Sequence, residues 1–356
     1  MVAGVVRFYE LGIGIGEACR GVGIAPAGGV SVKLRNIAMA AAGAAAATAA
    51  YAIFIEPRWL QCTRTTMHFA HLPAPLEGLR IALLTDLHAS GDTPRGLIAR
   101  AVRMAMRERP DMIAITGDIA ESEAMLEPTL DELAELRAPL GVYIVPGNHD
   151  YRDVGIERWH DAVSRRRSLT DLTNRARVID VPAAIPRLAV TMEHRAGRAA
   201  VGDSARLCIA GVDDLAEGRP RLDVVHGRSE RDFTILLAHN PDQAEQARRG
   251  IDKVDLVLSG HTHGGQVRLP GIGAIVNSAE HADLYEAGVR RRPWTQVYTS
   301  RGIGTVHLPV RFLTRPEMAI VTLTSAPRGG PRWQRLLRTD AGRGPARAPR
   351  DYQPAS

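Results

Sequence analysis

Five short polar blocks, each directly after a predicted strand, constrain the fold of this chain more than any other feature. They are residues 86–88 (Asp-Leu-His), 117–118 (Gly-Asp), 147–150 (Gly-Asn-His-Asp), 239–240 (His-Asn) and 260–263 (Gly-His-Thr-His). In an open α/β sheet, residues just past the carboxyl ends of the strands meet in one crevice. We therefore expect blocks that are far apart in the sequence to form a single site.

Short β-rich runs alternate with amphipathic stretches from about residue 79 to residue 324. The predicted strands are 79–85, 112–116, 142–145, 207–210, 233–238, 254–258, 296–299 and 319–324, and the predicted helices are 94–109, 123–137, 156–166 and 242–249. Near-continuous apolar strands that alternate with helices are typical of a layered α/β domain. The 356 residues are enough for one large domain or two modest ones.

An uncharged run of 19 residues, 37–55, precedes this region. At about 1.5 Å per residue it nearly spans a hydrocarbon core of about 30 Å, although 11 of its residues are alanine. We interpret it as a single membrane anchor; a signal peptide cleaved near residues 50–52 and a buried helix are the alternatives. The nearby basic residues are Arg20, Lys33 and Arg35 before the run and Arg58 and Arg64 after it. This slight bias favours a main domain outside the cytoplasm.

Several function classes are excluded by composition and by missing motifs. Seven arginines and two aspartates in residues 327–356 carry +5 of the formal net charge of +6, so the basic character belongs to a tail and no specific nucleic-acid partner is expected. The three cysteines lie far apart, which excludes a cysteine-based metal site. A Walker loop, a GxSxG elbow and a framed GxGxxG are missing, which excludes P-loop, serine-hydrolase and dinucleotide chemistry.

The polar blocks combine carboxylates and imidazoles with one amide oxygen. This mixture suits manganese, iron or zinc, whereas calcium and magnesium favour oxygen ligands alone. The candidate ligands are Asp86, His88, Asp118, Asn148, His239, His261 and His263. Seven ligands are more than one ion needs, and two ions that share a carboxylate would use them all.

The ordered set DLH, GD, GNHD, H and GHTH resembles the calcineurin-like metallophosphoesterases over about residues 80–325. Residues 260–266 (GHTHGGQ), 268–270 and 300–304 are similar to a membrane-anchored subgroup that includes enzymes similar to UDP-2,3-diacylglucosamine hydrolases of lipid A synthesis. The resemblance implies an α/β/β/α sandwich with an N-terminal apolar anchor helix.

The resemblance also implies a role for each candidate residue. Asp86, His88 and His263 would hold one metal, Asn148, His239 and His261 would hold the second, and Asp118 would bridge them. Two manganese ions are expected, with iron or zinc as alternatives, and they would activate a water for in-line attack on phosphorus.

Three further residues complete the predicted site. His149 would act as the acid at the leaving oxygen, Asp150 would orient His149, and Arg301 would clamp a phosphate oxygen. The alternatives are a structural His149–Asp150 pair and a surface ion pair of Arg301. His307, beside the Gly-rich loop, is the one other histidine that could belong to this site.

The predicted domain order follows from these assignments. It comprises an N-terminal extension (1–35), an anchor or signal segment (36–56), a linker (57–79), the metallophosphoesterase domain (80–325) and a disordered basic tail (326–356). We expect a single-pass protein of the bacterial inner membrane that contacts lipid through its N-terminal segment.

The expected substrate is a phosphodiester or pyrophosphate, and a lipid-linked nucleotide, UDP-2,3-diacylglucosamine, is the first candidate. UDP-sugars are cytoplasmic, whereas the charge bias favours an outside domain. An extracytoplasmic cell-wall or nucleotide substrate is therefore an alternative. A non-catalytic binding module of the same fold and a metal-dependent nuclease are the other hypotheses.

Overall fold

The computed structural model describes residues 28–182, 204–226, 232–248, 253–275 and 278–326. The chain divides into two structural units, residues 1–49 and residues 50–356. Residues 1–27 of the predicted N-terminal extension and residues 327–356 of the predicted tail lie outside the described residues.

Helix α1 (Gly28–Ala50) contains most of the predicted apolar run. Within the described residues, one helical segment, Val32–Arg58, is long and apolar enough to cross a membrane by length and composition. The regular α-helix ends at Ala50 and the chain continues through a π turn (Tyr51–Ile55) and a 3-10 turn (Glu56–Arg58). Pro57 has no N–H group, so the helical ladder does not continue past this point.

Two six-stranded sheets form the body of the described chain. The first sheet has the order β1 (Gln61–Phe69), β14 (Glu317–Ser325), β2 (Arg80–Leu84), β3 (Met112–Thr116), β4 (Val142–Val145) and β5 (Thr170–Asp171). The second has the order β12 (Gly288–Arg291), β13 (Gln296–Thr299), β9 (Leu256–Ser259), β8 (Phe233–Leu237), β7 (Ala205–Gly211) and β6 (Arg175–Val181). Strands β2–β5 are parallel to one another, as are β7, β8, β9 and β13.

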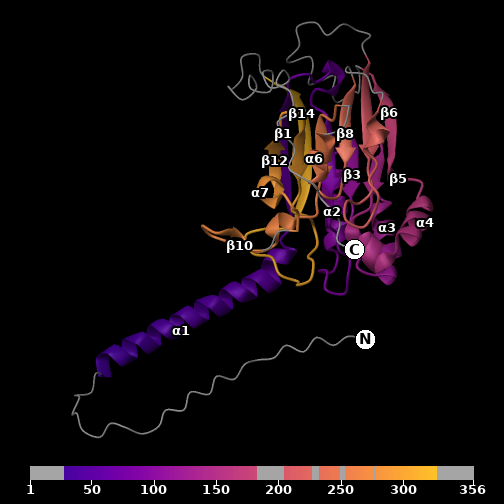
Figure 1. The fold of residues 1–356 in the computed structure, drawn as a ribbon. Coiled ribbons are helices and arrows are strands. Elements are labelled where there is room, and N and C mark those ends of the chain that lie inside the picture. The colour runs from indigo at the N-terminus through magenta and orange to yellow at the C-terminus, as the bar shows by residue number, and fades with distance from the viewer. Residues whose placement is uncertain (1–27, 183–203, 227–231, 249–252, 276–277, 327–356) are drawn as a thin grey trace, which may run out of the picture. The chain divides into compact units, whose positions relative to one another are not determined.

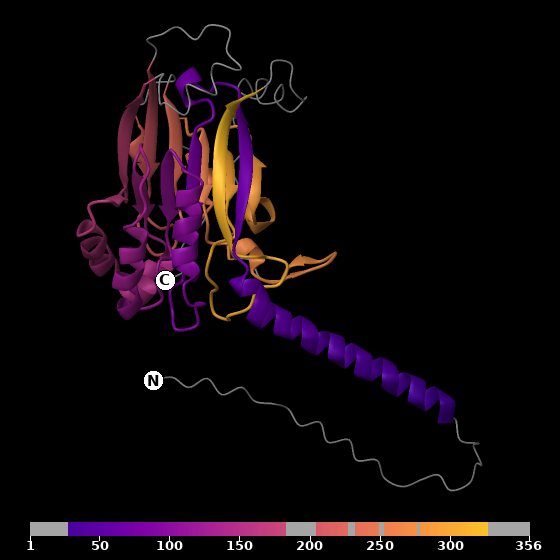
Figure 2. The same ribbon diagram turned by 180° about the vertical axis from the view of Figure 1, so that it is seen from behind.

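Helices cover the outer faces of the two sheets. They are α2 (Leu97–Arg107), α3 (Glu123–Leu133) and α4 (Ile156–Ser164) on the first sheet and α6 (Gln243–Ala247) and α7 (Ala282–Tyr285) on the second. Figure 1 shows α6 in front of the body, and the opposite view in Figure 2 brings α2 and α3 to the front. A small β ribbon, β10 (Arg268–Leu269) with β11 (Gly273–Ala274), projects from one end of the body in both views.

The buried side chains alternate between the layers, as the period of a strand requires. In β2, Ile81 and Leu83 pack between the two sheets, whereas Ala82 and Leu84 pack against the helices. This alternation requires both faces of the strand to be apolar, and it explains the near-continuous apolar runs in the sequence. The predicted α/β/β/α sandwich is confirmed.

The sequence analysis missed the edge strands β1 and β6. Strand β1 lies where a linker was predicted and pairs in parallel with β14, from Gln61 beside Glu317 to Phe69 beside Ser325. Its sequence is largely polar, and its partner lies at the far end of the domain, so no local pattern indicates the pairing. Residues 61–69 are thus part of the first sheet.

We predict that Met67→Ala lowers the free energy of unfolding by about 2–5 kcal/mol, because the Met67 side chain is fully buried between the sheets. Thr66→Ala, at the neighbouring exposed position of β1, should change it by less than about 0.5 kcal/mol. Urea unfolding followed by circular dichroism measures both variants. Equal and small effects would mean that residues 61–69 are a linker after all.

Candidate metal centre

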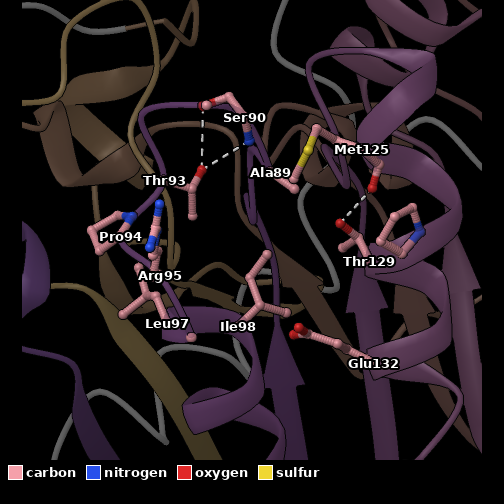
Figure 3. Close-up of a pocket in the computed structure, with 13 residues that line it drawn as sticks. Ala89, Ser90, Thr93, Pro94, Arg95, Leu97, Ile98, Met125, Thr129 and Glu132 are labelled. Carbon is pink, nitrogen blue, oxygen red and sulfur yellow. Dashed lines mark hydrogen bonds between the residues drawn. The ribbon is translucent and has the colours of Figure 1, made fainter.

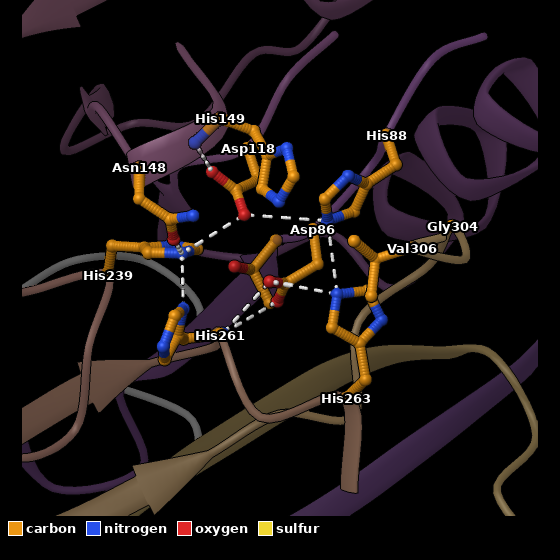
Figure 4. Close-up of polar contacts among 12 residues, drawn as sticks. Asp86, His88, Asp118, Asn148, His149, His239, His261, His263, Gly304 and Val306 are labelled. Atoms are coloured by element: carbon orange, nitrogen blue, oxygen red, sulfur yellow. Dashed lines mark hydrogen bonds and ion pairs between the residues drawn. The ribbon is translucent and has the colours of Figure 1, made fainter. Parts of the chain in front are cut away.

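All seven predicted ligands lie together at the carboxyl ends of strands from both sheets. Asp86 and His88 follow β2, Asp118 follows β3, Asn148 follows β4, His239 follows β8, and His261 and His263 follow β9. Figure 4 shows their side chains turned toward one another. The parallel strands of the two sheets end on the same side of the body, which brings loops of both sheets to one place.

The first group of side chains is Asp86, His88 and His263, whose potential ligand atoms all lie within 4.8 Å of one another. The Nε2 atom of His263 lies 3.0 Å from Nε2 of His88 and 3.5 Å from Oδ1 of Asp86. All three residues are buried.

The second group is Asp118, His239 and His261, within the same 4.8 Å limit. The Nε2 atom of His239 lies 3.1 Å from Oδ2 of Asp118 and 3.1 Å from Nδ1 of His261. The Oδ1 atom of Asn148 lies 3.1 Å from the same Nε2. Asp118 connects the two groups, because its Oδ2 is also 3.4 Å from Nε2 of His88.

The outer nitrogens of three of these rings face acceptors. Nδ1 of His239 lies 2.8 Å from the carbonyl oxygen of Thr116, and Nε2 of His261 lies 3.1 Å from that of Ser278. Nδ1 of His88 lies 3.2 Å from Oε1 of Glu121. A carbonyl or carboxylate oxygen only accepts, so each outer nitrogen carries the proton and each inner nitrogen of the neutral ring presents a lone pair.

Facing ring nitrogens test whether this set fits a metal. The inner nitrogens of His239 and His261 point at each other at 3.1 Å, and the inner nitrogen of the neutral His261 carries a lone pair. Two nitrogens bound to one cation at about 2.0–2.1 Å are roughly 3 Å apart, so this spacing matches a shared ion. The donor set of imidazole, carboxylate and amide oxygen therefore fits divalent transition metals.

The outer nitrogen of His263 has a different neighbour, the guanidinium of Arg311. Nη2 of Arg311 lies 3.3 Å from Nδ1 of His263, and Arg311 is itself fully buried. Burial lowers the pKa of His263 well below its ordinary range, and the charges of His88 and Arg311 add to this effect. His263 is therefore neutral. A guanidinium only donates, so Nδ1 of His263 accepts from Arg311 and the ring proton lies on the inner Nε2 in this structure.

The backbone at the site is unusual for residues with side chains. Ten non-glycine residues of the described chain have positive φ, and five of them are Asp86 (50°), His88 (42°), Asp118 (54°), His261 (70°) and His263 (51°). Residues of this kind rarely adopt the left-handed region, and such strain gathers at functional sites. The surrounding fold therefore holds the loops in a strained conformation that aims these side chains inward.

Close packing explains two of the glycines in the polar blocks. A Cβ atom on Gly260 would lie 2.1 Å from Oδ2 of Asp86, and one on Gly147 would lie 2.3 Å from Oδ1 of Asp118. Any larger residue would displace one of these carboxylates.

Opposite charges at the site stabilise one another against burial. Burial alone would raise the pKa of Asp118, but His239 and His88 hold it well below its usual range. Burial alone would lower the pKa of His239, but the Asp118 carboxylate raises it well above its ordinary value. Burial and the charge of His239 lower the pKa of His261 to about 4. A bound cation would replace the proton that His239 carries here.

The structure corrects the role predicted for Asp150. Its carboxylate accepts hydrogen bonds from the backbone N–H groups of Gly147, Asp118 and Ile119, each at 2.9 Å. The ring of His149 instead pairs with Asp153, with Nδ1 2.6 Å from Oδ2. Asp150 thus ties the loop after β4 to the loop after β3, and Asp153 orients the histidine.

Arg301 lies in an ion pair, because two of its guanidinium nitrogens already have partners. Its Nε donates to Oε2 of Glu317 at 2.5 Å and its Nη2 donates to Thr63 at 3.3 Å. It is therefore an ion-paired residue, the alternative that the sequence left open, and a role at a phosphate oxygen stays a prediction. His307 does reach the site, with its ring centre 6.2 Å from that of His149.

Three residues of the site were not predicted: Glu121, Asp153 and Arg311. Asp153 carries a usable signal, because residues four apart face each other on a helical turn and it is the fourth residue after His149. Glu121 and Arg311 carry no comparable local signal.

A separate pocket of about 280 Å³ lies between the loop after His88 and helix α3 (Figure 3). Ser90, Thr93 and Arg95 line one side, and Met125 and Glu132 line the other. The predicted site residues do not line it, so we assign it no part in the metal centre.

Comparison with known proteins agrees with this geometry. The family described as calcineurin-like phosphoesterase matches residues 79–265. The chain is 30% identical to the metallophosphoesterase YkuE of Bacillus subtilis over 77% of this chain and 89% of that protein. It is 31% identical to the phosphodiesterase YaeI of Escherichia coli over 77% of this chain and 92% of that protein. It is also 32% identical to a bovine transmembrane protein with metallophosphoesterase domain, over 72% of this chain but only 55% of that longer protein.

We predict that Asp150→Ala lowers the free energy of unfolding by more than about 2 kcal/mol, because three buried N–H groups lose their acceptor. Asp153→Ala is the matched control and should change stability by less than about 0.5 kcal/mol, since Asp153 is exposed. Chemical unfolding of both variants measures the difference. If Asp150→Ala is as stable as the control, the carboxylate does not join the two loops.

Proposed function

The chain belongs to the calcineurin-like phosphoesterases, and from this membership we propose that it hydrolyses a phosphodiester or pyrophosphate bond with two divalent cations. Asp86, His88 and His263 would hold one cation, Asn148, His239 and His261 would hold the other, and Asp118 would lie between them. The observation that carries the proposal is the pair of ring-nitrogen contacts at 3.0 and 3.1 Å, one in each group, joined by a single carboxylate oxygen.

The two ions, when bound, would supply a low-pKa water and neutralise charge on the phosphoryl oxygens. The protein residues keep the ligand side chains in the orientation that would bind these ions. Glu121, Thr116 and Ser278 fix the outer protons of three ligand rings and so keep their inner lone pairs available. Manganese is our proposed native metal, with iron or zinc as alternatives, since a mixed set of imidazoles and oxygen ligands suits divalent transition metals.

His149 is proposed as the acid at the leaving oxygen. Its backbone N–H donates to Oδ1 of Asp118 at 2.8 Å, and its ring lies 4.8 Å from the ring of His88. The carboxylate of Asp153 keeps a proton on Nδ1, so Nε2 is the nitrogen that exchanges a proton with the leaving group.

We propose that the protein is anchored in the bacterial inner membrane by the segment that contains α1. The apolar span Val32–Arg58 and the relative named as a transmembrane protein support this proposal. The first substrate that we propose is UDP-2,3-diacylglucosamine, cleaved to a lipid monophosphate and UMP. A cell-wall or other extracytoplasmic phosphodiester is the second, because the basic residues Lys33 and Arg35 precede the apolar run.

A substrate panel tests these proposals on the full chain in detergent. After metal removal with a chelator, manganese, zinc or iron(II) is added back, and turnover of bis-p-nitrophenyl phosphate is compared with turnover of UDP-2,3-diacylglucosamine. Full activity of the metal-free protein would refute the two-cation proposal. Cleavage of the aryl diester without cleavage of the UDP-sugar would support phosphodiester hydrolysis and would refute UDP-2,3-diacylglucosamine as the substrate.

Asp118→Asn is expected to lose both metals and to lower kcat by at least about 100-fold, because its Oδ2 lies beside histidines of both groups. Asp131→Asn, at an exposed position of α3, is the control and should keep both. Elemental analysis of the purified proteins gives the metal content. Two bound metals in the Asp118 variant would show that this residue does not bridge them.

His149→Ala is expected to keep both metals and to lower kcat by about 10²–10⁴-fold for a poor leaving group, and by much less for p-nitrophenolate. Asp153→Asn should have the same dependence on the leaving group with a smaller loss, about tenfold, because it acts only by orienting the ring. Kinetics on a series of aryl diesters tests both variants. A loss that does not depend on the leaving group would argue against the assignment of His149 as the acid.

A further inference from the structure

The exposed large apolar side chains of the body gather in one place. Among the described residues after Ala50 they are Phe54, Ile55, Trp59, Leu269, Ile272, Ile275, Leu308 and Leu313. They fall in the segments 54–59, 269–275 and 308–313, and Ile272 at the tip of the β10–β11 ribbon is 75% exposed. Single exposed apolar residues are ordinary, but a gathered set marks an interaction surface.

Backbone hydrogen bonds join the three segments into one surface, which we call the apolar patch. Arg268 N donates to the carbonyl oxygen of Phe312 at 2.9 Å, and Phe312 N donates to that of Gln266 at 3.0 Å. Arg311 N donates to the carbonyl oxygen of Ala52 at 3.0 Å, and Leu313 N donates to the Glu56 carboxylate at 3.0 Å. The patch is thus a fixed part of the body.

Basic and aromatic groups accompany the apolar ones. The guanidinium of Arg315 lies 3.9 Å from the centre of the Trp59 ring, and the exposed Arg58 donates to the carbonyl oxygens of Ile53 and Phe54. Tryptophan and arginine beside exposed aliphatic residues are the composition of protein surfaces at the boundary between lipid and water.

The occupant of the patch follows from the chain itself. The candidate membrane span runs to Arg58 and therefore includes Phe54 and Ile55, which are also members of the patch. If the span lies in a membrane, the part of the patch at Phe54 and Ile55 lies at the lipid. Leu269, Ile272 and Ile275 belong to the same patch and are therefore within reach of lipid. A second copy of the chain or a soluble partner has no such connection.

We propose that the apolar patch docks the body onto the surface of the lipid bilayer. The substrate would then be a phosphoester carried by a membrane lipid, and this second part of the proposal rests on the function proposed above. The loops of the patch are those of the metal centre: the Gln266 side chain donates to the carbonyl oxygens of Val306 and Leu308. His307, between them, lies beside His149. Docking would therefore bring the metal centre to the lipid headgroups.

The experiment uses the full chain in nanodiscs of phosphatidylcholine with a minor share of phosphatidylglycerol and a phospholipid that bears a diazirine in its acyl chain. After irradiation, labelled peptides are mapped by mass spectrometry. We expect labels in residues 269–275 and 308–313 in addition to the span. Labels confined to residues 28–58, or crosslinks from 269–275 to another copy in place of lipid, would overturn the proposal.

Two matched variants sharpen the test. Leu269→Asp/Ile272→Asp/Ile275→Asp should lower labelling of residues 269–275 by about tenfold or more, whereas Leu269→Met/Ile272→Leu/Ile275→Leu should keep it. Unchanged labelling of the aspartate variant would also overturn the proposal. Turnover of the soluble bis-p-nitrophenyl phosphate does not depend on lipid contact. Both variants should retain it if their fold and their metal centre are intact.

A separate assay tests whether the substrate is carried by a lipid: turnover of a diacylglycerol p-nitrophenyl phosphodiester in the nanodisc. The aspartate variant should lose about tenfold in kcat/KM on this lipid and keep its rate on the soluble diester. If the aspartate variant cleaves the lipid diester as fast as the unsubstituted protein does, the substrate is not carried by a membrane lipid. Labelled patch peptides without turnover of either diester would support docking and refute the proposed function instead.

Discussion

The crowding of imidazole nitrogens and carboxylates at the carboxyl ends of two sheets is the constraint on which this structure depends. Inner ring nitrogens of neighbouring histidines face each other at about 3 Å, in a place from which water is largely excluded. Such an arrangement is stable only if positive charge lies among the groups. The left-handed backbone at five ligands and the absence of a side chain at Gly260 serve the same convergence.

The centre of the fold could be predicted from the sequence because its strands are apolar on both faces. Ile81 to Leu84 pack alternately on the other sheet and on the helices. Every position must therefore be apolar, and the strand is recognisable in the sequence as a continuous apolar run. The edges could not be predicted in this way. Strand β6 (Arg175–Val181) has three charged residues, at 175, 177 and 180, and β1 pairs with a strand more than 250 residues away along the chain.

The ligands were predictable because each follows a strand, whereas their supporting contacts depend on distances between loops. Nothing in the local sequence tells that Asp150 accepts from Gly147, Asp118 and Ile119 and so leaves His149 to Asp153. For the same reason Arg301, beside the Gly-rich loop, looks like a free cation until Glu317 of the neighbouring strand is placed next to it. Residue type limits what a group can do, and tertiary contacts decide which of its options is used.

Arg311 connects the two properties of this protein within a single residue. Its backbone N–H donates to Ala52, inside the candidate membrane span, and its guanidinium reaches the outer nitrogen of His263. The same guanidinium also donates to the carbonyl oxygens of Arg301, Gly304 and Thr314, which fixes the loop that carries His307 and the exposed Leu308. Burial of this cation is costly, and acceptors of the loop at its Nε, Nη1 and Nη2 atoms offset that cost. The ligand His263 and the end of the candidate span thus both contact Arg311, one through its guanidinium and the other through its backbone.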